Sequence, residues 1–366
     1  MISAIIFVIL HTIMVLDDEA FKKLSLSIAG IRFPLVMAVL FLHAMTATKL
    51  SGHELFHDAL YPIAYWIGDT GVPAYFFISS LLLYYSSKTY LQQIRNRSKT
   101  LLIPYLIWNG LYLVGAYMIP FWLFNIDVKV IIFSQSDFGV WEYIRCFWDR
   151  CDFDKGNFRP ILTPMWYVRN LMIMYLLSPV IYYIIRTTHI LLPAICCWFW
   201  ITDPHISLIW QTLTMFSLGA VFPVLDINPM DLLDVHKIDI IGLFIIFGIA
   251  DCTTHIFFPT PYDLQIHRLA LIANTFFCLW VGLYLHRHGI ESKYLSKTAF
   301  FVFCTHYPIM QAVRGACNHF PGLPDGIHIL LYLLSVALVT GICLMFYNLL
   351  NRYWPWFLRI STGNRG

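Results

Sequence analysis

The sequence predicts an all-α fold, a polytopic integral membrane protein with about ten transmembrane helices. Hydrophobic residues make up 59% of the 366 residues, charged residues only 12%, and the mean hydropathy is +0.67. Soluble domains carry about 25% charged residues, so this chain has too few to cover a globule of its length. Lipid is therefore the main solvent that we expect around it.

Ten apolar stretches are the predicted spans, because a transmembrane helix needs about 20 mostly apolar residues. They cover residues 30–50, 66–87, 100–124, 166–186, 189–202, 205–225, 238–258, 267–286, 298–316 and 327–350. The stretch 189–202 is the shortest and contains Pro193. No internal repeat or flexible linker divides the series, which favours a single membrane domain.

Residues 1–16 are also apolar but lie outside this series. They lack a basic leader and a small-residue cleavage site, so a cleaved signal peptide is not expected. An eleventh span, an interfacial helix and translation from an early start codon remain open. We divide the chain into this apolar segment with its linker (1–27), the membrane domain (28–352) and a short cytoplasmic tail (353–366).

The orientation follows from Lys and Arg, which accumulate on the cytoplasmic side of membrane proteins. If the span 30–50 starts in the cytoplasm, the inner side receives fifteen of the 24 Lys and Arg residues, more than the outer side. The inner residues are Lys22, Lys23, Arg32, Lys88, Arg95, Arg97, Lys99, Arg186, Lys237, Arg287, Lys293, Lys297, Arg352, Arg359 and Arg365. Both ends of the ten-helix domain are then cytoplasmic, and the loop 125–165 is the one sizeable outer segment.

Charge and cysteine usage exclude several classes of partner. The net charge is only +3 and its basic residues occur in short clusters, so nucleic acid is not an expected partner. The nine cysteines include one adjacent pair and no C-x-x-C, so neither a metal site nor a disulfide framework is indicated.

Arg32 and His43 are the first ionisable residues that the predicted spans contain, and such residues are costly in lipid. Eleven helical steps return to within about 20° of the same direction and rise about 16 Å. The two side chains therefore share one helix face, with Arg32 at the inner boundary and His43 near the midplane. His43 suits a general base. Simple helix contacts for His43 and headgroup contacts for Arg32 are an equally weighted alternative.

Further polar residues lie at or inside other spans. Arg95, Arg97 and Lys99 precede the third span, where they could hold phosphates or merely obey the positive-inside rule. The other candidates are Asn109, Trp166, Arg169 and His306. His306 lies about 13 Å beyond Lys297 and hence near the midplane, like His43. Asp251 and His255, four residues apart, suggest a proton relay, although a boundary position in contact with water is favoured.

Five sequence blocks in this order resemble the acyltransferase-3 family of bacterial membrane O-acyltransferases. They are IRFPLVMAVLFLH, GVPAYFFISSLLL, RNRSKTLLIPYLIWN, PMWYVRNLMIMYLLSP and FCTHYPI, within a match from about residue 28 to about 350. Arg32 and His43 correspond to the family's arginine and histidine in the first span. The basic block corresponds to Arg95, Arg97 and Lys99, and the W-F-x-R type block to Trp166, Tyr167 and Arg169. Ser79-Ser80 replaces the family's Ser-Gly, and Thr100 aligns with the second arginine of the basic block.

The resemblance implies a bacterial inner-membrane enzyme that passes an acyl group, usually acetyl from acetyl-CoA, to a hydroxyl of a cell-surface carbohydrate. Acyl-CoA is then a co-substrate, and no permanently bound cofactor is expected. The expected partners are acyl-CoA, an extracytoplasmic glycan or lipid-linked glycan acceptor, and membrane lipids.

A mechanism combines the resemblance with the residues. Arg32, Arg95, Arg97 and Lys99 would hold the phosphates of acyl-CoA, and His43 would deprotonate the acceptor hydroxyl or, less favoured, carry the acyl group itself. Arg169 or Asn109 would stabilise the oxyanion, and His306 and Trp166 would help to hold the acceptor. A transporter or flippase for a polysaccharide precursor or a small organic acid is the competing class, and a structural membrane subunit is a third.

Overall fold

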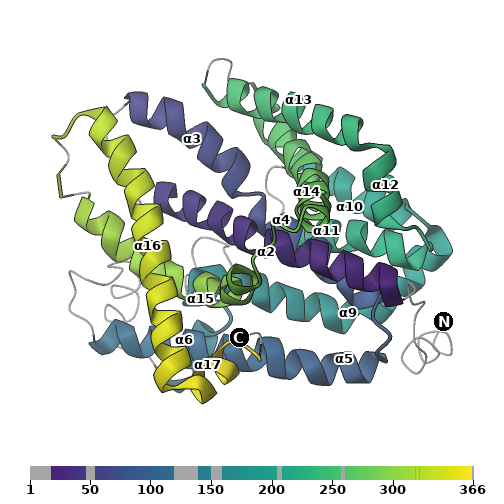
Figure 1. The fold of residues 1–366 in the computed structure, drawn as a ribbon, viewed down its shortest axis with the longest axis horizontal. Coiled ribbons are helices and arrows are strands. Elements are labelled where there is room, and N and C mark those ends of the chain that lie inside the picture. The colour runs from purple at the N-terminus through teal and green to yellow at the C-terminus, as the bar shows by residue number, and fades with distance from the viewer. Residues whose placement is uncertain are drawn as a thin grey trace. The chain divides into compact units, whose positions relative to one another are not determined.

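The computed structural model describes residues 18–46, 54–118, 139–149, 159–203, 208–256, 260–317, 319–320 and 322–364. These residues form helices joined by turns, and no β-strand occurs among them (Figure 1). The predicted all-α fold is therefore confirmed. Residues 1–16, whose status the sequence left open, lie outside the described part of the chain.

The first half of the chain contains helices within the predicted apolar stretches and additional helices between them. They are α2 (Asp18–Thr46), α3 (Glu54–Gly68), α4 (Gly71–Tyr84), α5 (Tyr90–Arg97), the π-helix η1 (Ser98–Leu102), α6 (Ile103–Met118) and α8 (Val140–Cys146). A single 3₁₀ turn, η2 (Thr163–Met165), then leads into the next long helix.

The second half continues in the same way. Its helices are α9 (Trp166–Thr188), α10 (Leu191–Thr202), α11 (Leu208–Val224), α12 (Pro229–Val235), α13 (Lys237–Ile256), α14 (Asp263–Arg287), α15 (Lys293–Cys317), α16 (Asp325–Tyr353) and α17 (Pro355–Ser361). Each of the ten predicted stretches therefore overlaps a helix in its described residues.

Length and apolar character single out fewer helices as candidate spans. Within the described residues, five segments are long and apolar enough to cross a membrane: Glu19–Met45, Leu60–Tyr84, Thr163–Thr188, Asp263–Arg287 and Asp325–Tyr353. A sixth is added if α11 and α12, bent by 99° at their junction, count together, and α10 is a shorter apolar helix. The structure thus supports a polytopic membrane protein with five or six clear candidate spans.

The chain forms two compact units. The first unit comprises Met1–Val39, Pro62–Asn96 and Leu171–Ser296, and the second comprises Leu40–Tyr61, Arg97–Asn170 and Lys297–Gly366. Several long helices, α2 and α9 among them, pass from one unit into the other along their own length.

Close helix packing holds the first unit together. A methyl group on Gly219 of α11 would overlap the Phe77 carbonyl oxygen and the Ser80 hydroxyl of α4. This chain has Ser79-Ser80 where the family has Ser-Gly. The glycine at this helix contact is instead Gly219, on the facing helix α11. Helices α13 and α14 lie side by side in the same unit, with the Phe244 and Phe277 rings stacked 3.8 Å apart (Figure 1).

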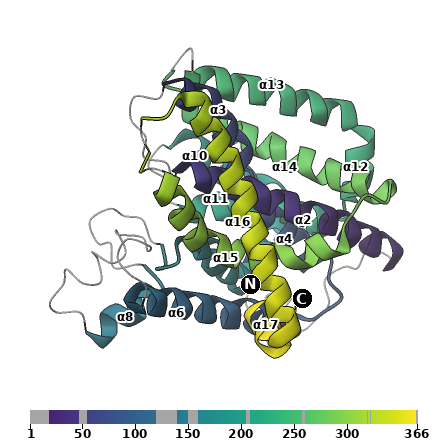
Figure 2. The ribbon, with the colours of Figure 1, turned by 60° about the vertical axis from the view of Figure 1, so that its left-hand side comes forward.

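In the second unit the C-terminal helix packs back on α6 (Figure 2). Trp108 of α6 donates its indole N–H to the Ser361 carbonyl at 2.8 Å and packs on the buried cluster of Phe301, Tyr347 and Leu358. Gly363 follows with φ of +64° and leaves no room for a side chain against the Thr100 backbone. The residues predicted as a short tail thus form a docked helix beside the basic block.

Candidate reaction centre

Helix α2 carries both Arg32 and His43. It runs without a break from Asp18 to Thr46, with Pro34 inside it, so the eleven-residue separation is a helical one as expected. Arg32 is partly buried, and its backbone carbonyl accepts a hydrogen bond from the Tyr75 hydroxyl within the first unit. His43 belongs to the second unit and is partly buried.

The two histidines predicted near the midplane lie against each other. The ring centroids of His43 on α2 and His306 on α15 are 5.3 Å apart, with 32° between the ring planes. Tyr307 presents its ring edge-on to His43 at 5.2 Å. The sequence placed both histidines at a similar depth but could not say that they meet.

The surroundings of His306 fix which of its nitrogens carries the hydrogen. Nδ1 lies 2.8 Å from the Phe303 carbonyl oxygen and 3.2 Å from that of Val302. A carbonyl only accepts hydrogen bonds, so Nδ1 is the donor and Nε2 bears the lone pair. His306 is fully buried, yet Nε2 has no hydrogen-bond partner in the part of the chain that the structure describes. A buried polar atom left unsatisfied costs about 1–3 kcal/mol, a cost often met at functional sites.

An aromatic wall and a cation complete these surroundings. The Phe303 ring lies 6.0 Å from His306 and is met edge-on by Tyr167 of α9 at 5.8 Å. Arg159, in the predicted loop 125–165, lies within electrostatic range of His43. Sequence analysis assigned no role to this residue, because nothing local to a loop residue shows which helix it approaches.

Arg169 belongs to a second polar cluster in the same unit. Its guanidinium is 5% exposed, donates to the Trp148 carbonyl and to Asn170 Oδ1, and lies 5.2 Å from the Trp148 ring. Arg145 and Asp149 form an ion pair at 2.5 Å on the same loop. Arg169, near the start of α9, is therefore hydrogen-bonded to acceptors of the protein itself.

Asn109 and Trp166 occupy positions of a more structural kind. The buried Asn109 amide donates to the Tyr105 carbonyl at 2.8 Å and accepts from the Leu162 N–H at 3.1 Å. It thereby ties α6 to the segment that precedes η2. Trp166 begins α9 and is partly buried.

The basic block spans the end of α5 and the π-helix η1. Arg95 and Lys99 are exposed and Arg97 is partly buried. Arg95 belongs to the first unit, whereas Arg97 and Lys99 belong to the second. Cations on a surface helix can reach an anionic ligand without first breaking a buried contact.

The first unit holds a different histidine site. His267 of α14 lies between two carboxylates, with Nδ1 2.8 Å from Asp251 and Nε2 3.3 Å from Asp69. The Tyr65 ring stacks on it at 4.0 Å. Asp251 was considered with His255, whose side chain is outside the described residues, but the structure pairs Asp251 with His267.

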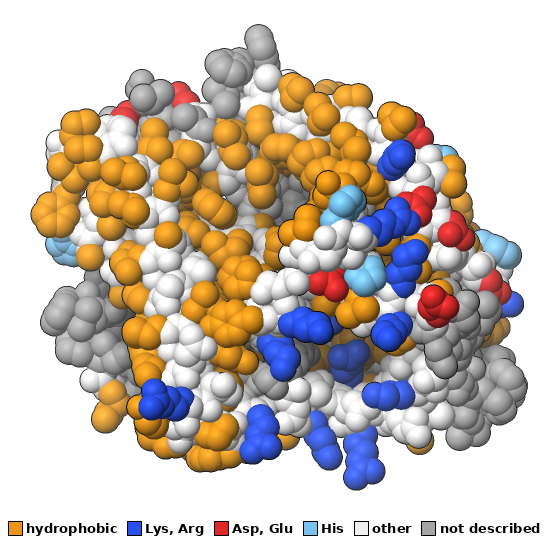
Figure 3. All heavy atoms as spheres, viewed as in Figure 1, with side chains coloured by type: hydrophobic (Ala, Val, Ile, Leu, Met, Phe, Trp, Pro, Cys, Tyr) orange, Lys and Arg blue, Asp and Glu red, His pale blue; other side chains and the backbone are white. Residues whose placement is uncertain are grey.

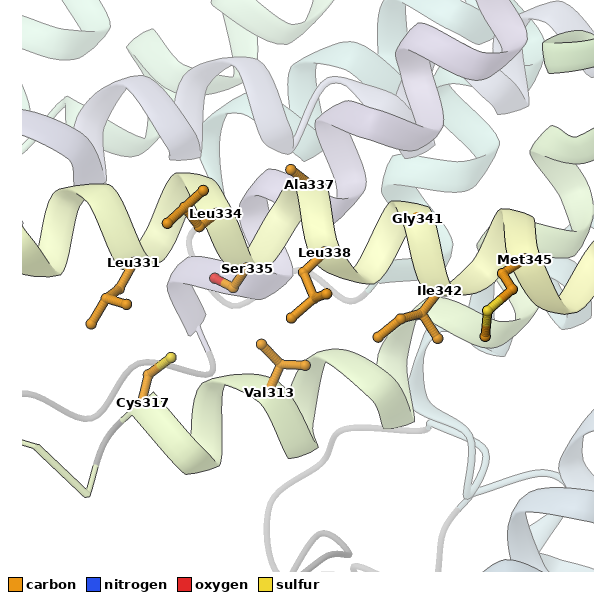
Figure 4. A pocket seen from close by; sticks show the side chains of 10 residues that line it. All are labelled: Val313, Cys317, Leu331, Leu334, Ser335, Ala337, Leu338, Gly341, Ile342 and Met345. Carbon is orange, nitrogen blue, oxygen red and sulfur yellow. The ribbon is translucent and has the colours of Figure 1, made fainter.

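Two hollows lined by described residues are mainly apolar. A groove of about 710 Å³ runs between α15 and α16, where Val313 and Cys317 face Leu331, Ser335 and Leu338 (Figure 4). Hydrophobic side chains also cover the visible face of α16 in Figure 3. The groove offers contacts to apolar chains but no acid–base group.

A second pocket, of about 350 Å³, lies between α6, α15 and α16 and is lined by Trp108, Phe301 and Thr305 among others. His306 lies about 100° further round α15 than Thr305. The pair of His43 and His306 is the candidate reaction centre among the described residues.

Comparisons with known proteins bear on what this centre does. A family model described as an acyltransferase domain, acyltransferase-3, matches residues 25–348. The succinoglycan biosynthesis protein ExoH of Rhizobium meliloti (strain 1021) is 23% identical over 370 residues, covering 94% of this chain and 93% of that protein. No solved structure matches the chain.

Proposed function

The chain belongs to the acyltransferase-3 family, and from that premise we propose that it passes an acyl group from a cytoplasmic acyl-CoA to a hydroxyl of a cell-surface carbohydrate. Family membership makes the chain an acyltransferase, and its apolar helices make it a membrane protein. Acetyl-CoA is the proposed donor. The observation that carries the proposal is the His43–His306 pair.

The proposed reaction needs a base. An acceptor hydroxyl is a weak nucleophile until its proton is removed as the oxygen attacks the thioester carbonyl. The new C–O bond then replaces the C–S bond, and the CoA thiolate leaves and takes up a proton. Two imidazoles in contact, one of them with an available lone pair, can accept that proton and return it.

The donor side of the proposal rests on Arg32, Arg95, Arg97 and Lys99. These residues lie on α2, α5 and η1, on the side that the Lys and Arg distribution assigns to the cytoplasm. Arginine and lysine bind phosphates through charge-assisted hydrogen bonds, and acyl-CoA carries phosphates far from its thioester. We assign these four residues to the phosphates, so that the thioester extends along α2 toward His43.

The acceptor side is proposed to be a glycan or a lipid-linked glycan that enters from outside. The name of the relative ExoH refers to the biosynthesis of a polysaccharide, succinoglycan, which supports an acceptor of this class. Trp166 and Arg169 lie at the predicted outer end of α9, where such an acceptor would arrive, and Asn109 of α6 accepts a hydrogen bond from Leu162, just before η2 and α9. We propose that this group shapes the acceptor entrance.

The proposed topology has ten spans in a bacterial inner membrane, with both ends of the domain cytoplasmic. Besides the five or six candidate spans, it assigns α6, α10, α13 and α15 to spans as well. Cysteine labelling at the exposed Arg359 and at Trp141 tests it, because the two positions should lie on opposite sides.

The direct test uses full-length protein in membrane vesicles, radiolabelled acetyl-CoA and surface polysaccharide. Wild-type protein should transfer label without an ion gradient, and His43→Gln should lower the rate at least about 100-fold. His319→Gln, at an exposed histidine of the second unit, is the matched control and should behave as wild type. If the protein instead moved a polysaccharide precursor across the membrane only when an ion gradient is present, and transferred no acyl group, it would be a transporter. The ester lost from the polysaccharide of cells lacking the gene, seen by NMR, would name acyl group and acceptor.

A further inference from the structure

The two histidines of the pair have different surroundings, which points to different roles in the reaction. This inference rests on the proposed function. We propose that Nε2 of His306 is the atom that takes the proton from the acceptor hydroxyl. His43 then serves the donor side, where its imidazole contacts the thioester carbonyl.

The hydrogen bonds of His306 select this atom. Because Nδ1–H is directed at the Phe303 and Val302 carbonyls, at 2.8 and 3.2 Å, the ring is held in one tautomer and one orientation. The lone pair on Nε2 meets no partner among the described residues, and the side chain is fully buried. A neutral imidazole with its second nitrogen fixed on an acceptor is the arrangement that a general base needs.

The same contacts stabilise the ring after it has taken the proton. As an imidazolium, His306 donates through both nitrogens, and Nδ1–H already has its acceptors in place. The O–H bond of the acceptor breaks, its oxygen forms the new ester bond, and the C–S bond to CoA breaks. The proton on Nε2 then passes to the leaving thiolate, which restores the neutral ring.

The position of His43 fits the other half of the reaction. Its ring lies 5.3 Å from His306 and is flanked by the edge of Tyr307. It belongs to α2, the helix that also carries Arg32 at its proposed donor end. An imidazole N–H at this place can stabilise the negative charge that develops on the thioester carbonyl oxygen during attack.

The test compares His306→Asn with His306→Gln in full-length protein. Asparagine can place an amide N–H near the position of Nδ1 and keep the bond to Phe303, but it has nothing at Nε2. Glutamine reaches toward Nε2 with a group that is not basic. Both variants should lower kcat by about 100- to 10,000-fold and change KM for acyl-CoA less than about twofold. Their rates should also lose the decline at acidic pH that protonation of the base causes in wild type.

Imidazole rescue separates a missing base from a damaged fold. His306→Gly should regain activity in proportion to added imidazole, measured per folded protein recovered by size exclusion in detergent. His328→Gln removes another fully buried histidine of the second unit and should keep the wild-type pH profile. A nearly wild-type rate for His306→Asn, or a loss without rescue and with an unchanged pH profile, would overturn the assignment. If wild-type protein itself transfers nothing from acyl-CoA, the proposed function fails first and takes this inference with it.

Discussion

Buried histidines occur in both units, and their partners differ in kind. His267 in the first unit has a carboxylate oxygen at each ring nitrogen, from Asp251 at 2.8 Å and Asp69 at 3.3 Å. His306 in the second unit has backbone carbonyls at one nitrogen and no partner within the described chain at the other. Both side chains are at most 1% exposed, so burial does not distinguish them.

This difference is the basis on which we propose a structural role for His267 and a reactive role for His306. A ring with both nitrogens engaged has no lone pair to offer a substrate, and any reaction would first have to break a buried hydrogen bond. A ring held at one nitrogen is oriented and still able to accept a proton. Changes at His306 should therefore alter rate, and changes around His267 should alter stability.

The largest expected effect is on rate, in the double variant His43→Gln/His306→Gln. If the two imidazoles act in one step, each single change already removes most of the acceleration, and the double variant is little slower than the slower single variant. Each single change should cost about 100- to 10,000-fold in kcat. The measurement is acyl transfer from labelled acetyl-CoA under saturating donor. Fully multiplicative losses would mean that the rings act independently.

The matched experiment in the first unit is Asp251→Asn. It leaves His267 buried with a weaker partner, and breaking a buried pair costs about 3–5 kcal/mol. We expect a clearly lower unfolding temperature in detergent and an unchanged kcat per folded molecule. Asp69→Asn should cost less, because the Asp69 side chain is 31% exposed and water can replace part of the contact. A loss of kcat in Asp251→Asn at normal stability would erase the contrast between the units.

The sequence predicted the helices because each one depends on a local property. An apolar run of about 20 residues is legible without knowing its neighbours, and all ten runs overlap helices in their described residues. The depth of a residue within a span can also be predicted from the local sequence, because it follows from the helical rise per residue. This rise placed His43 and His306 at similar levels. Helix α3, which precedes the second predicted span, and the docked α17 were not anticipated, because their positions depend on packing.

Contacts between helices could not be predicted from these local properties of the sequence. His43 and His306 are 263 positions apart, and whether they touch depends on how α2 and α15 pack. The four-residue spacing drew attention to Asp251 and His255, yet Asp251 bonds to His267, on the next helix. Two residues four positions apart need not pair, because the fold can bring other side chains closer to either of them. A single sequence does not show which side chains these are.

The smallest expected effect comes from Gly219→Ala in the first unit. The new methyl group would overlap the Phe77 carbonyl and the Ser80 hydroxyl, so α4 and α11 must move apart, at a cost of about 1–3 kcal/mol. Gly242→Ala on α13 is the matched control, because its methyl group would meet nothing within 4 Å and should stabilise the helix by up to about 1 kcal/mol. Thermal unfolding in detergent should therefore move in opposite directions for the two variants, while both retain the wild-type kcat. A reduced kcat in Gly219→Ala would show that the packing of α4 on α11 affects the reaction, which a purely structural role for this helix contact does not allow.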